Sequence, residues 1–196
     1  MPSFATAMVL LSAYLLGSIP FGVILTRLGG AGDLRQIGSG NIGATNVLRT
    51  GRKGLAAATL ILDGAKGGVA VLIAHHYWPD LAIAAGGAAF LGHLYPVWLK
   101  FHGGKGVATM LGVALALYWP AGLTFAVVWL AMLALTKRSS LGGISAAAAA
   151  PIAAAAGDRS DVVLLLMGMT LLLIWKHRAN ISRLLDGTEP RVGQGG

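Results

Sequence analysis

Long apolar stretches alternate with short connectors of glycine, polar and basic residues along almost the whole chain. Seven apolar segments stand out, at residues 4–27, 55–74, 81–99, 107–118, 121–135, 141–156 and 162–175. A helix that crosses the hydrocarbon core of a bilayer needs about 20 mostly apolar residues, and most of these segments approach that length. The pattern therefore predicts an all-α, polytopic membrane helix bundle with seven transmembrane helices, which forms a single domain over residues 1–196.

The fourth and fifth segments are short, and only Trp119 and Pro120 separate them. A proline within a helix removes a backbone hydrogen bond, which argues against one long helix across both segments. They form either two short spans or one bent hairpin, and a count of five spans with both segments re-entrant is the alternative to seven. The first segment has no basic stretch before it and no small-residue cleavage site after it, so we interpret it as a span and not as a removable signal.

Lys and Arg are concentrated in every second connector. The first, third and fifth connectors and the C-terminal tail are basic, whereas the three intervening connectors hold one basic residue, Arg159. Cytoplasmic loops of membrane proteins carry an excess of Lys and Arg. We therefore expect a multi-pass protein of the cell inner (plasma) membrane, with its N-terminus outside and its C-terminus in the cytoplasm; five spans would give the same faces.

Composition supports this class and excludes others. Hydrophobic residues make up 56% of the chain and charged residues 11%, too few charges for the surface of a soluble domain. The absence of cysteine excludes disulfides, thiolate metal sites and cysteine nucleophiles. The net charge of +8 comes from residues at the ends of apolar spans, so no nucleic-acid partner is expected. The basic connectors lack a cluster of Asp, Glu and His, so we expect no metal and no other cofactor.

The first basic connector has the composition of an anion site. Residues 38–49 read GSGNIGATNVLR, and glycines let a backbone turn its N–H groups toward an anion. Arg49 has the planar fork that suits a phosphate. The neutral donors are Ser39, Asn41, Thr45 and Asn46. The alternative is a polar loop that caps the next helix through Asn41 or Thr45, but the length and richness of the loop favour function.

The end of the third apolar segment and the third connector together, residues 92–106, read GHLYPVWLKFHGGKG and precede an apolar helix. A glycine-rich turn with Lys105 at a helix N-terminus gathers N–H groups, the helix dipole and an ammonium around an anion. Taken alone, this turn is equally compatible with a flexible connector. Beside the first connector, it indicates a second half of one anion site.

Two further groups are ambiguous. In the tail, His177 and Asn180 lie three residues apart and share one helix face, which suits a common ligand. The same tail also fits a basic stop-transfer sequence that contacts anionic lipid. Ser139 and Ser140, after two basic residues in the fifth connector, carry the same ambiguity.

Two pairs of charged or titratable residues lie elsewhere. Asp63 and Lys66 fall inside the second apolar segment, where an unpaired charge costs about 2.5–3.5 kcal/mol, so we expect them to pair with each other in a mainly structural role. His75 and Asp80 have the H-x-x-x-x-D spacing, in which a His can act as a general base that the Asp orients. The expected topology puts them on the outer face, away from the anion-binding groups, so we interpret them as an ordinary interfacial connector.

Three segments together resemble a known family. Residues 38–49 (GSGNIGATNVLR), 92–109 (GHLYPVWLKFHGGKGVAT) and 177–184 (HRANISRL) are similar, in this order, to the signature segments of the bacterial acyl-phosphate:glycerol-3-phosphate acyltransferases. The stretches LGSIPFG at 16–22 and LDGAKG at 62–67 also resemble that family. In the serine group, the family often has a further hydroxyl residue where this chain has Gly142 and Gly143.

The resemblance implies a seven-helix enzyme that makes 1-acyl-glycerol 3-phosphate from acyl phosphate and glycerol 3-phosphate, at the membrane lipid. It also implies a functional link to a soluble acyl-carrier-protein:phosphate acyltransferase that supplies the donor. By similarity, the loop of Ser39 and the glycines around Lys105 hold the acyl phosphate. The catalytic residues that the resemblance implies are His177, Asn180, Lys105 and Ser39. The substrate-binding residues that it implies are Asn41, Thr45, Asn46, Arg49, Gly103, Gly104, Gly106, Ser139 and Ser140.

Two other functions fit the spans less well. A transporter for a phosphorylated solute needs polar residues along both halves of a path, and the outer half lacks them apart from its connectors. A membrane scaffold without activity does not account for the density of Gly, Ser and Asn in the basic connectors. An acyltransferase accounts for both features.

Overall fold

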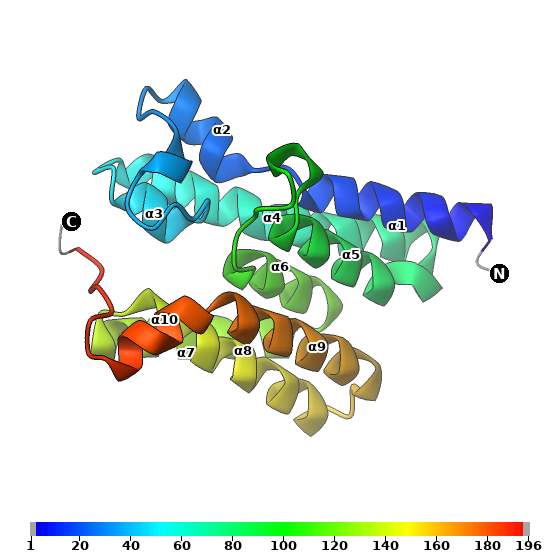
Figure 1. Ribbon diagram of the computed structural model, residues 1–196. Helices are drawn as coiled ribbons and strands as arrows, with labels where there is room; N and C mark the ends of the chain where they lie inside the picture. The colour runs from blue at the N-terminus through cyan, green and yellow to red at the C-terminus, as the bar shows by residue number, and fades with distance from the viewer. Residues whose placement is uncertain (1–2, 194–196) are drawn as a thin grey trace.

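The computed structural model describes residues 3–193, and within that range it contains helices and no strands (Figure 1). The α-helices are α1 (Phe4–Gly17), α2 (Phe21–Leu28), α3 (Ala44–Leu48), α4 (Lys53–Tyr77), α5 (Ala82–Leu94), α6 (Val107–Leu117), α7 (Trp119–Thr136), α8 (Ser139–Ala156), α9 (Ser160–Lys176) and α10 (Arg178–Leu185). Short 3₁₀ turns are η1 (Leu34–Gln36), η2 (Pro79–Leu81) and η3 (Val97–Leu99). The prediction of an all-α bundle is confirmed.

The helices form two groups on either side of α6. Helices α1, α4 and α5 pack together on one side, and α7, α8 and α9 pack together on the other (Figure 1). The main hydrophobic core joins the groups, with Phe90 of α5, Met110 of α6, Phe125 of α7 and Leu166 of α9 all buried. Helix α6 is therefore the central element, and its N-terminal end carries the Lys105 loop.

Glycine brings the backbones of α4 and α6 into direct contact. A Cβ atom on Gly112 would collide with the backbone of Gly64, and one on Gly67 would lie 2.7 Å from the carbonyl oxygen of Thr109. Small residues allow this approach in a membrane, where close packing replaces the hydrophobic drive between helices. The glycines within these spans thus serve helix packing.

Length and composition identify five segments that can each cross a membrane: Phe4–Leu28, Lys53–Tyr77, Pro79–Leu99, Trp119–Thr136 and Ser139–Ala156. A sixth is α9, followed by α10, which is bent from it by 61°. Helix α6 is apolar but has only 11 residues. Each of the seven expected segments thus contains at least one helix, while length alone does not establish the seventh span.

Prolines explain where the helices differ from the expected segments. Residues 121–135 belong to an 18-residue helix, α7, which begins at Trp119 and accommodates Pro120 because the first turn of a helix has no acceptor for the missing N–H. One residue, Tyr118, joins α6 to α7, so the two form a hairpin of separate helices. The segment 81–99 is not one helix: α5 ends at Leu94 before Pro96, and η3 follows.

The first segment is also interrupted, at Ser18–Pro20 between α1 and α2. The expected pair of Asp63 and Lys66 lies beside this break, with 2.8 Å between the Lys66 Nζ and Asp63 Oδ1 atoms, and both side chains are buried. Lys66 Nζ also donates to the carbonyl oxygen of Ile19 at 2.8 Å. The pair therefore forms as expected, and it stabilises a carbonyl group at the interrupted helix.

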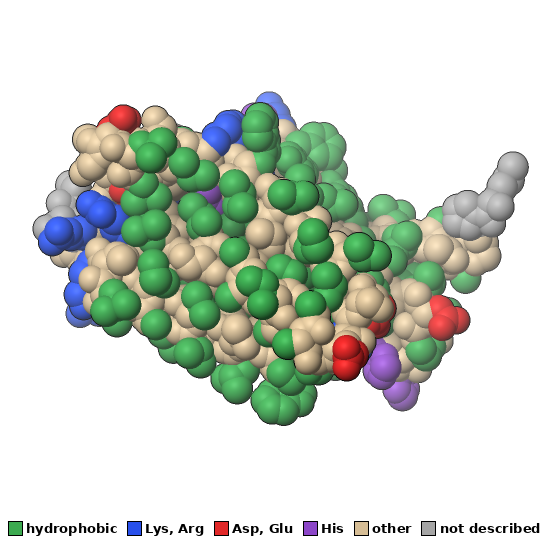
Figure 2. Space-filling view, turned by 90° about the horizontal axis from the view of Figure 1, so that it is seen from below, with side chains coloured by type: hydrophobic (Ala, Val, Ile, Leu, Met, Phe, Trp, Pro, Cys, Tyr) green, Lys and Arg blue, Asp and Glu red, His purple; other side chains and the backbone are tan. Residues whose placement is uncertain are grey.

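The two ends of the bundle differ in charge. On the face in Figure 2, most Lys and Arg side chains lie toward the end that holds α2 and α10 in Figure 1, whereas the opposite end shows Asp or Glu and His side chains without visible Lys or Arg. The first, third and fifth connectors and the tail all line one cavity at the basic end. The predicted grouping of these connectors at one end is thus confirmed.

Candidate active site

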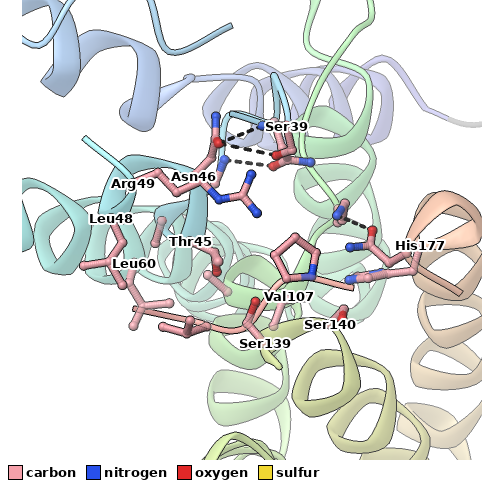
Figure 3. A pocket seen from close by; sticks show the side chains of 18 of the residues that line it. Ser39, Thr45, Asn46, Leu48, Arg49, Leu60, Val107, Ser139, Ser140 and His177 are labelled. Atoms are coloured by element: carbon pink, nitrogen blue, oxygen red, sulfur yellow. Dashed lines mark hydrogen bonds between the residues drawn. The ribbon is translucent and has the colours of Figure 1, made fainter. Parts of the chain in front are cut away.

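A cavity of about 310 Å³ lies where the basic connectors meet. The first connector, the loop before α6, the start of α8, the α9–α10 junction and the tail all contribute to its wall (Figure 3). Of the residues expected from the sequence, the wall contains Ser39, Asn41, Thr45, Asn46, Arg49, Lys105, Gly106, Ser139, Ser140, His177 and Asn180. The structure therefore gathers side chains that are up to 141 positions apart in the chain, from Ser39 to Asn180, into one site.

The first connector is organised by Asn46, which is 3% exposed. Its Oδ1 atom accepts hydrogen bonds from the N–H (3.1 Å) and the hydroxyl (3.4 Å) of Ser39 (Figure 3). Its amide donates to the carbonyl oxygens of Leu34 and Ile37. Asn46 thus uses its polar atoms to hold the loop, while Thr45 beside it faces the cavity.

Asn41 and Arg49 complete this side of the wall. Asn41 Oδ1 accepts the Gly43 N–H at 2.9 Å, a local turn that precedes α3. Arg49, at the C-terminal end of α3, extends toward the middle of the cavity (Figure 3) and makes no ion pair with any residue of the described range 3–193. Gly38 has φ +54°, and a Cβ atom there would lie 2.9 Å from an Arg49 nitrogen. Glycine at this turn therefore leaves the guanidinium room.

Lys105 belongs to a buried polar chain that runs to the tail. Its Nζ atom donates to Asn180 Oδ1 at 2.5 Å, and Asn180 Nδ2 donates to Glu189 Oε1 at 2.6 Å. Arg183 Nε donates to the other oxygen of Glu189 at 2.8 Å. Burial, together with the positive charges of Arg183 and Arg49, lowers the pKa of Lys105 to about 8 against the opposing charge of Glu189. Lys105 is thus still mainly an ammonium at neutral pH.

His177, which follows the α9 span, has one ring nitrogen committed. Its Nδ1 atom lies 2.8 Å from the carbonyl oxygen of Leu173, which can only accept, so Nδ1 carries the hydrogen. Burial and the neighbouring Lys105 ammonium lower the pKa of His177 to about 4. At neutral pH the ring is therefore uncharged, and Nε2 holds a lone pair that can accept a hydrogen bond.

The glycines before Lys105 are placed differently from each other. Gly106 lines the cavity with φ +90°, where a Cβ atom would collide with the Phe90 ring. Gly103 and Gly104 are not in the cavity wall: their N–H groups donate to the carbonyl oxygens of Leu94 (3.2 Å) and His93 (3.1 Å). These two N–H groups hold the turn together.

Sequence reasoning missed several members of the wall. Glu189 carries the acidic end of the Lys105 chain, yet its position in a short tail gave no periodic or motif signal. Asp63 and His93 also line the cavity, and their side chains are 3% and 4% exposed. His75 and Asp80, which we rejected from the topology, lie outside the cavity wall, in the last turn of α4 and in η2.

The remaining polar residues fit an anion better than a metal. Within residues 3–193, no group of three or more His, Asp or Glu side chains lies close enough to share a metal ion. Asp63 pairs with Lys66, and Glu189 pairs with Arg183. This leaves the positive charges of Arg49, Lys105 and Arg191 along the wall without a matching acid.

Comparison with known proteins agrees with this picture. Residues 7–187 match the family model for glycerol-3-phosphate acyltransferase. A glycerol-3-phosphate acyltransferase of Mesorhizobium japonicum is 57% identical, over 99% of this chain and 100% of the relative, and one of Brucella anthropi is 58% identical, over 95% and 93%.

The crystal structure of PlsY (YgiH), an integral membrane glycerol 3-phosphate acyltransferase, in its glycerol 3-phosphate form superposes with a TM-score of 0.90 at 40% identity, covering 96% of each chain. The lysphosphatidic acid form superposes with a TM-score of 0.88 at 38% identity, covering 95% of each. The match thus extends over nearly the whole chain in both sequence and structure. This chain belongs to the family of integral membrane glycerol-3-phosphate acyltransferases.

Proposed function

We propose that the chain transfers an acyl group from acyl phosphate to the 1-hydroxyl of sn-glycerol 3-phosphate. The products are 1-acyl-glycerol 3-phosphate (lysophosphatidic acid) and inorganic phosphate, in the first membrane step of phospholipid synthesis. The observation that carries this proposal is the single cavity where Arg49, Lys105 and His177 meet from three separate connectors. PlsY, which resembles the chain over its length, is described in glycerol 3-phosphate and lysphosphatidic acid forms.

The charge of the wall suits two anionic substrates. Glycerol 3-phosphate and acyl phosphate both carry phosphate groups, which repel each other unless positive charge separates them. Arg49 offers a planar fork for one phosphate, and Lys105 offers an ammonium with three donors. These groups lie in a partly buried site, where their attraction for an anion is screened less than at the surface.

The cavity also has an apolar side. Leu60 of α4, Val107 of α6 and Trp129 of α7 line it alongside the polar residues. An acyl phosphate has a long hydrocarbon chain. This chain can pack against the apolar wall and the surrounding lipid without burying any polar group that lacks a hydrogen-bond partner. The combination of a basic side and an apolar side in one cavity fits an activated lipid better than a soluble sugar phosphate alone.

The reaction needs positioning more than a strong catalyst, because an acyl phosphate is already activated. The C1 hydroxyl oxygen of glycerol 3-phosphate attacks the acyl carbonyl carbon, a new C–O ester bond forms, and the bond from that carbon to the phosphate oxygen breaks. Holding the two reactants together is the main contribution. Lys105 and Arg49 stabilise the negative charge that develops on the carbonyl oxygen and the departing phosphate.

The hydroxyl proton passes to the departing phosphate in this proposal. His177 accepts a hydrogen bond from the hydroxyl through Nε2 and so orients it, but with a pKa of about 4 it is a weak base. A phosphate monoester has a second pKa of about 6, so the donor's phosphate holds a proton better. Gln in place of His177 retains an acceptor, so we expect His177→Gln to keep a measurable fraction of turnover. Loss of nearly all turnover with unchanged substrate binding would instead identify His177 as the base.

We further propose that the chain spans the inner membrane and that its cavity opens on the cytoplasmic side. The support is the excess of Lys and Arg at the cavity end of the bundle. This orientation gives access to glycerol 3-phosphate and to a donor made by a soluble acyl-carrier-protein:phosphate acyltransferase.

The decisive experiment uses the purified full chain in lipid, with palmitoyl phosphate and radiolabelled glycerol 3-phosphate and without added metal. We expect labelled lysophosphatidic acid from the wild type and at least a hundredfold less from Lys105→Ala. Lys53→Ala, at the exposed start of α4, is the matched control and should keep full activity. No product from a folded wild type would overturn the proposal and favour transport, to be tested by a flux assay.

A further inference from the structure

The floor of the cavity contains a buried group of side chains that the proposed mechanism does not use. The Nδ1 atom of His93 lies 3.7 Å from Oδ1 of Asp63, and the same oxygen lies 2.8 Å from Nζ of Lys66. Their side chains are 1–4% exposed. Asp63 and His93 line the cavity, whereas Lys66 lies behind them and bonds to Ile19. The group thus separates the active site from the interior of the bundle.

Charge neutralisation alone requires only two of these residues. Lys66 already pairs with Asp63, so His93 is not needed to balance the carboxylate. At 3.7 Å the Nδ1 atom of His93 is too far from Asp63 Oδ1 for a hydrogen bond, and it has no other hydrogen-bond partner among the described residues, so the ring lies beside the carboxylate as an electrostatic neighbour. The opposite ring edge, with Nε2, is turned away from Asp63.

That opposite edge contacts the loop before Lys105. A Cβ atom on Gly104 would collide with Nε2 of His93 and would lie 2.8 Å from Cε1 of the same ring. The backbone of His93 also accepts the Gly104 N–H at 3.1 Å. His93 therefore contacts the residue next to Lys105 twice, once with its ring and once with its carbonyl group.

The same segment is fixed from α4 by a second contact. Thr109, in the first turn of α6, donates its hydroxyl hydrogen to the carbonyl oxygen of Asp63 at 2.9 Å. Residue 63 thus contacts an element on each side of Lys105: its side chain lies beside His93 before the lysine, and its backbone carbonyl oxygen accepts from Thr109 after it. The link to the Gly104 turn therefore runs from the Asp63 side chain through the ring of His93.

We infer that Asp63 and His93 are positioning residues, which hold the Gly104–Lys105 turn so that the ammonium of Lys105 reaches Asn180 and the substrate phosphates. The inference deepens the proposed function and rests on it for the identity of the substrate. The position of Lys105 itself can be measured without substrate.

The test is the labelling of lysines in the full chain by an amine-reactive reagent, followed by mass spectrometry. His93→Phe places a larger, six-membered ring against Gly104, where the imidazole already leaves no room for a Cβ atom, and it removes both nitrogens. We expect Lys105 to be labelled at least fivefold faster in this variant than in the wild type, because the turn no longer holds its ammonium against Asn180. Lys66, which is buried at the bundle interior, reports global opening and should remain unlabelled.

Two further variants complete the design. His102→Phe changes an exposed histidine in the same loop and should leave the labelling of Lys105 unchanged. If His93→Phe does not fold, His93→Asn keeps a polar side chain beside Asp63 without the ring edge that contacts Gly104, and it should also speed the labelling. A labelling rate for Lys105 within twofold of the wild type, in a folded His93 variant, overturns the inference.

Kinetics separate this inference from the proposed function. We expect His93→Phe to raise the KM for glycerol 3-phosphate at least tenfold, and to add less than twofold in the Lys105→Ala background, because it acts through Lys105. Equal effects in both backgrounds would show that His93 acts independently of Lys105 and would contradict the inference. A wild type that makes no product would contradict only the proposed function, and the labelling result would still decide the role of His93.

Discussion

The two ends of the bundle are built from the same helices but use their polar residues differently. At the far end, Arg159 pairs with Asp161 at 2.8 Å and donates to the carbonyl oxygen of Leu117, the last residue of α6. At the cavity end, Arg49 and Arg191 make no ion pair within residues 3–193. Arg159 at the far end is thus satisfied by its neighbours, whereas Arg49 and Arg191 line the cavity without an acidic partner in the described range and can bind a ligand. Unpaired guanidinium groups that line a cavity, rather than the number of charges, identify the functional end.

The largest expected effect comes from removing the cavity-end guanidinium. Arg49→Ala should lower kcat/KM by about a hundredfold or more, since two charge-assisted hydrogen bonds to a phosphate contribute about 1.5–3 kcal/mol each. Steady-state rates with glycerol 3-phosphate and palmitoyl phosphate measure this effect. Arg49→Lys, which lacks the fork, should recover only part of the loss. A loss below fivefold for Arg49→Ala would contradict the assigned contact.

A variant of Asn46 tests whether the hydrogen bonds of this side chain stabilise the first connector. Asn46→Ala leaves the carbonyl oxygens of Leu34 and Ile37 and the N–H of Ser39 without their partner, at a cost of about 1–3 kcal/mol for a buried unsatisfied group. We expect a clear fall in the thermal unfolding temperature together with lower activity. Thr45→Ala, next to it, should lower activity at an unchanged unfolding temperature. If instead Thr45→Ala lowered the unfolding temperature and Asn46→Ala left it unchanged, Thr45 would be the residue that holds the loop.

The carboxylate of Glu189 influences the pH at which Lys105 loses its charge. Burial alone would raise its pKa, but the Asn180 and Arg183 donors hold the pKa below its usual value, so Glu189 is anionic at neutral pH. Its charge raises the pKa of Lys105. In Glu189→Gln, the pKa of Lys105 should fall below about 8, and the protonated fraction at pH 7.5 should decrease. A labelling titration of Lys105 measures this; a higher midpoint in the variant would contradict the assignment.

The wild type should show a matching dependence on pH. Lys105 binds a phosphate only as an ammonium, and its pKa is about 8, so the KM for glycerol 3-phosphate should rise as the pH increases through 8. A bound dianion stabilises the ammonium of Lys105. The fall in kcat, which reports the enzyme with bound substrate, should therefore begin at a higher pH than the fall in kcat/KM, which reports the free enzyme. Lys105→Arg, which stays charged, should remove this alkaline limb. A limb that persists in Lys105→Arg belongs to another group.

The smallest effect is expected at the far end. Arg159→Ala removes an exposed ion pair that solvent screens, so activity should change by less than twofold. The same steady-state assay as for Arg49→Ala makes the comparison direct. A large effect of Arg159→Ala on kcat/KM, in a folded variant, would remove the distinction between the two ends.

Periodicity and turn chemistry were enough to place the helices and most of the site. The apolar runs located the long apolar helices, and the density of Gly, Asn and basic residues located the three connectors, because both signals are local in the chain. The structure also shows two features that depend on contacts between distant segments. Gly103 and Gly104 have the composition of an anion loop, but their N–H groups bond to the end of α5. Glu189 looks like an ordinary tail residue until the tail folds against Asn180.

The Asp63–His93 pair could not be predicted for the same reason. The spacing of Asp63 and Lys66 on one helix shows their pairing, whereas His93 is on another helix, and only the packing of α4 against α5 brings it to Asp63. Likewise, the exposed His75 and Asp80 share a short spacing that imitates a catalytic motif. Sequence spacing reports neighbours along the chain, and the buried pair is a neighbour across helices.

The tail has a practical consequence for anyone who trims or tags this chain. The family match ends at residue 187, which invites a domain boundary there. Beyond it, Glu189 bonds to Asn180, and the Val192 N–H donates to the carbonyl oxygen of Lys137 at 2.7 Å. A boundary at 187 would delete part of the cavity wall while leaving every helix whole. Expression and helicity would then look normal in a protein that had lost one side of its site.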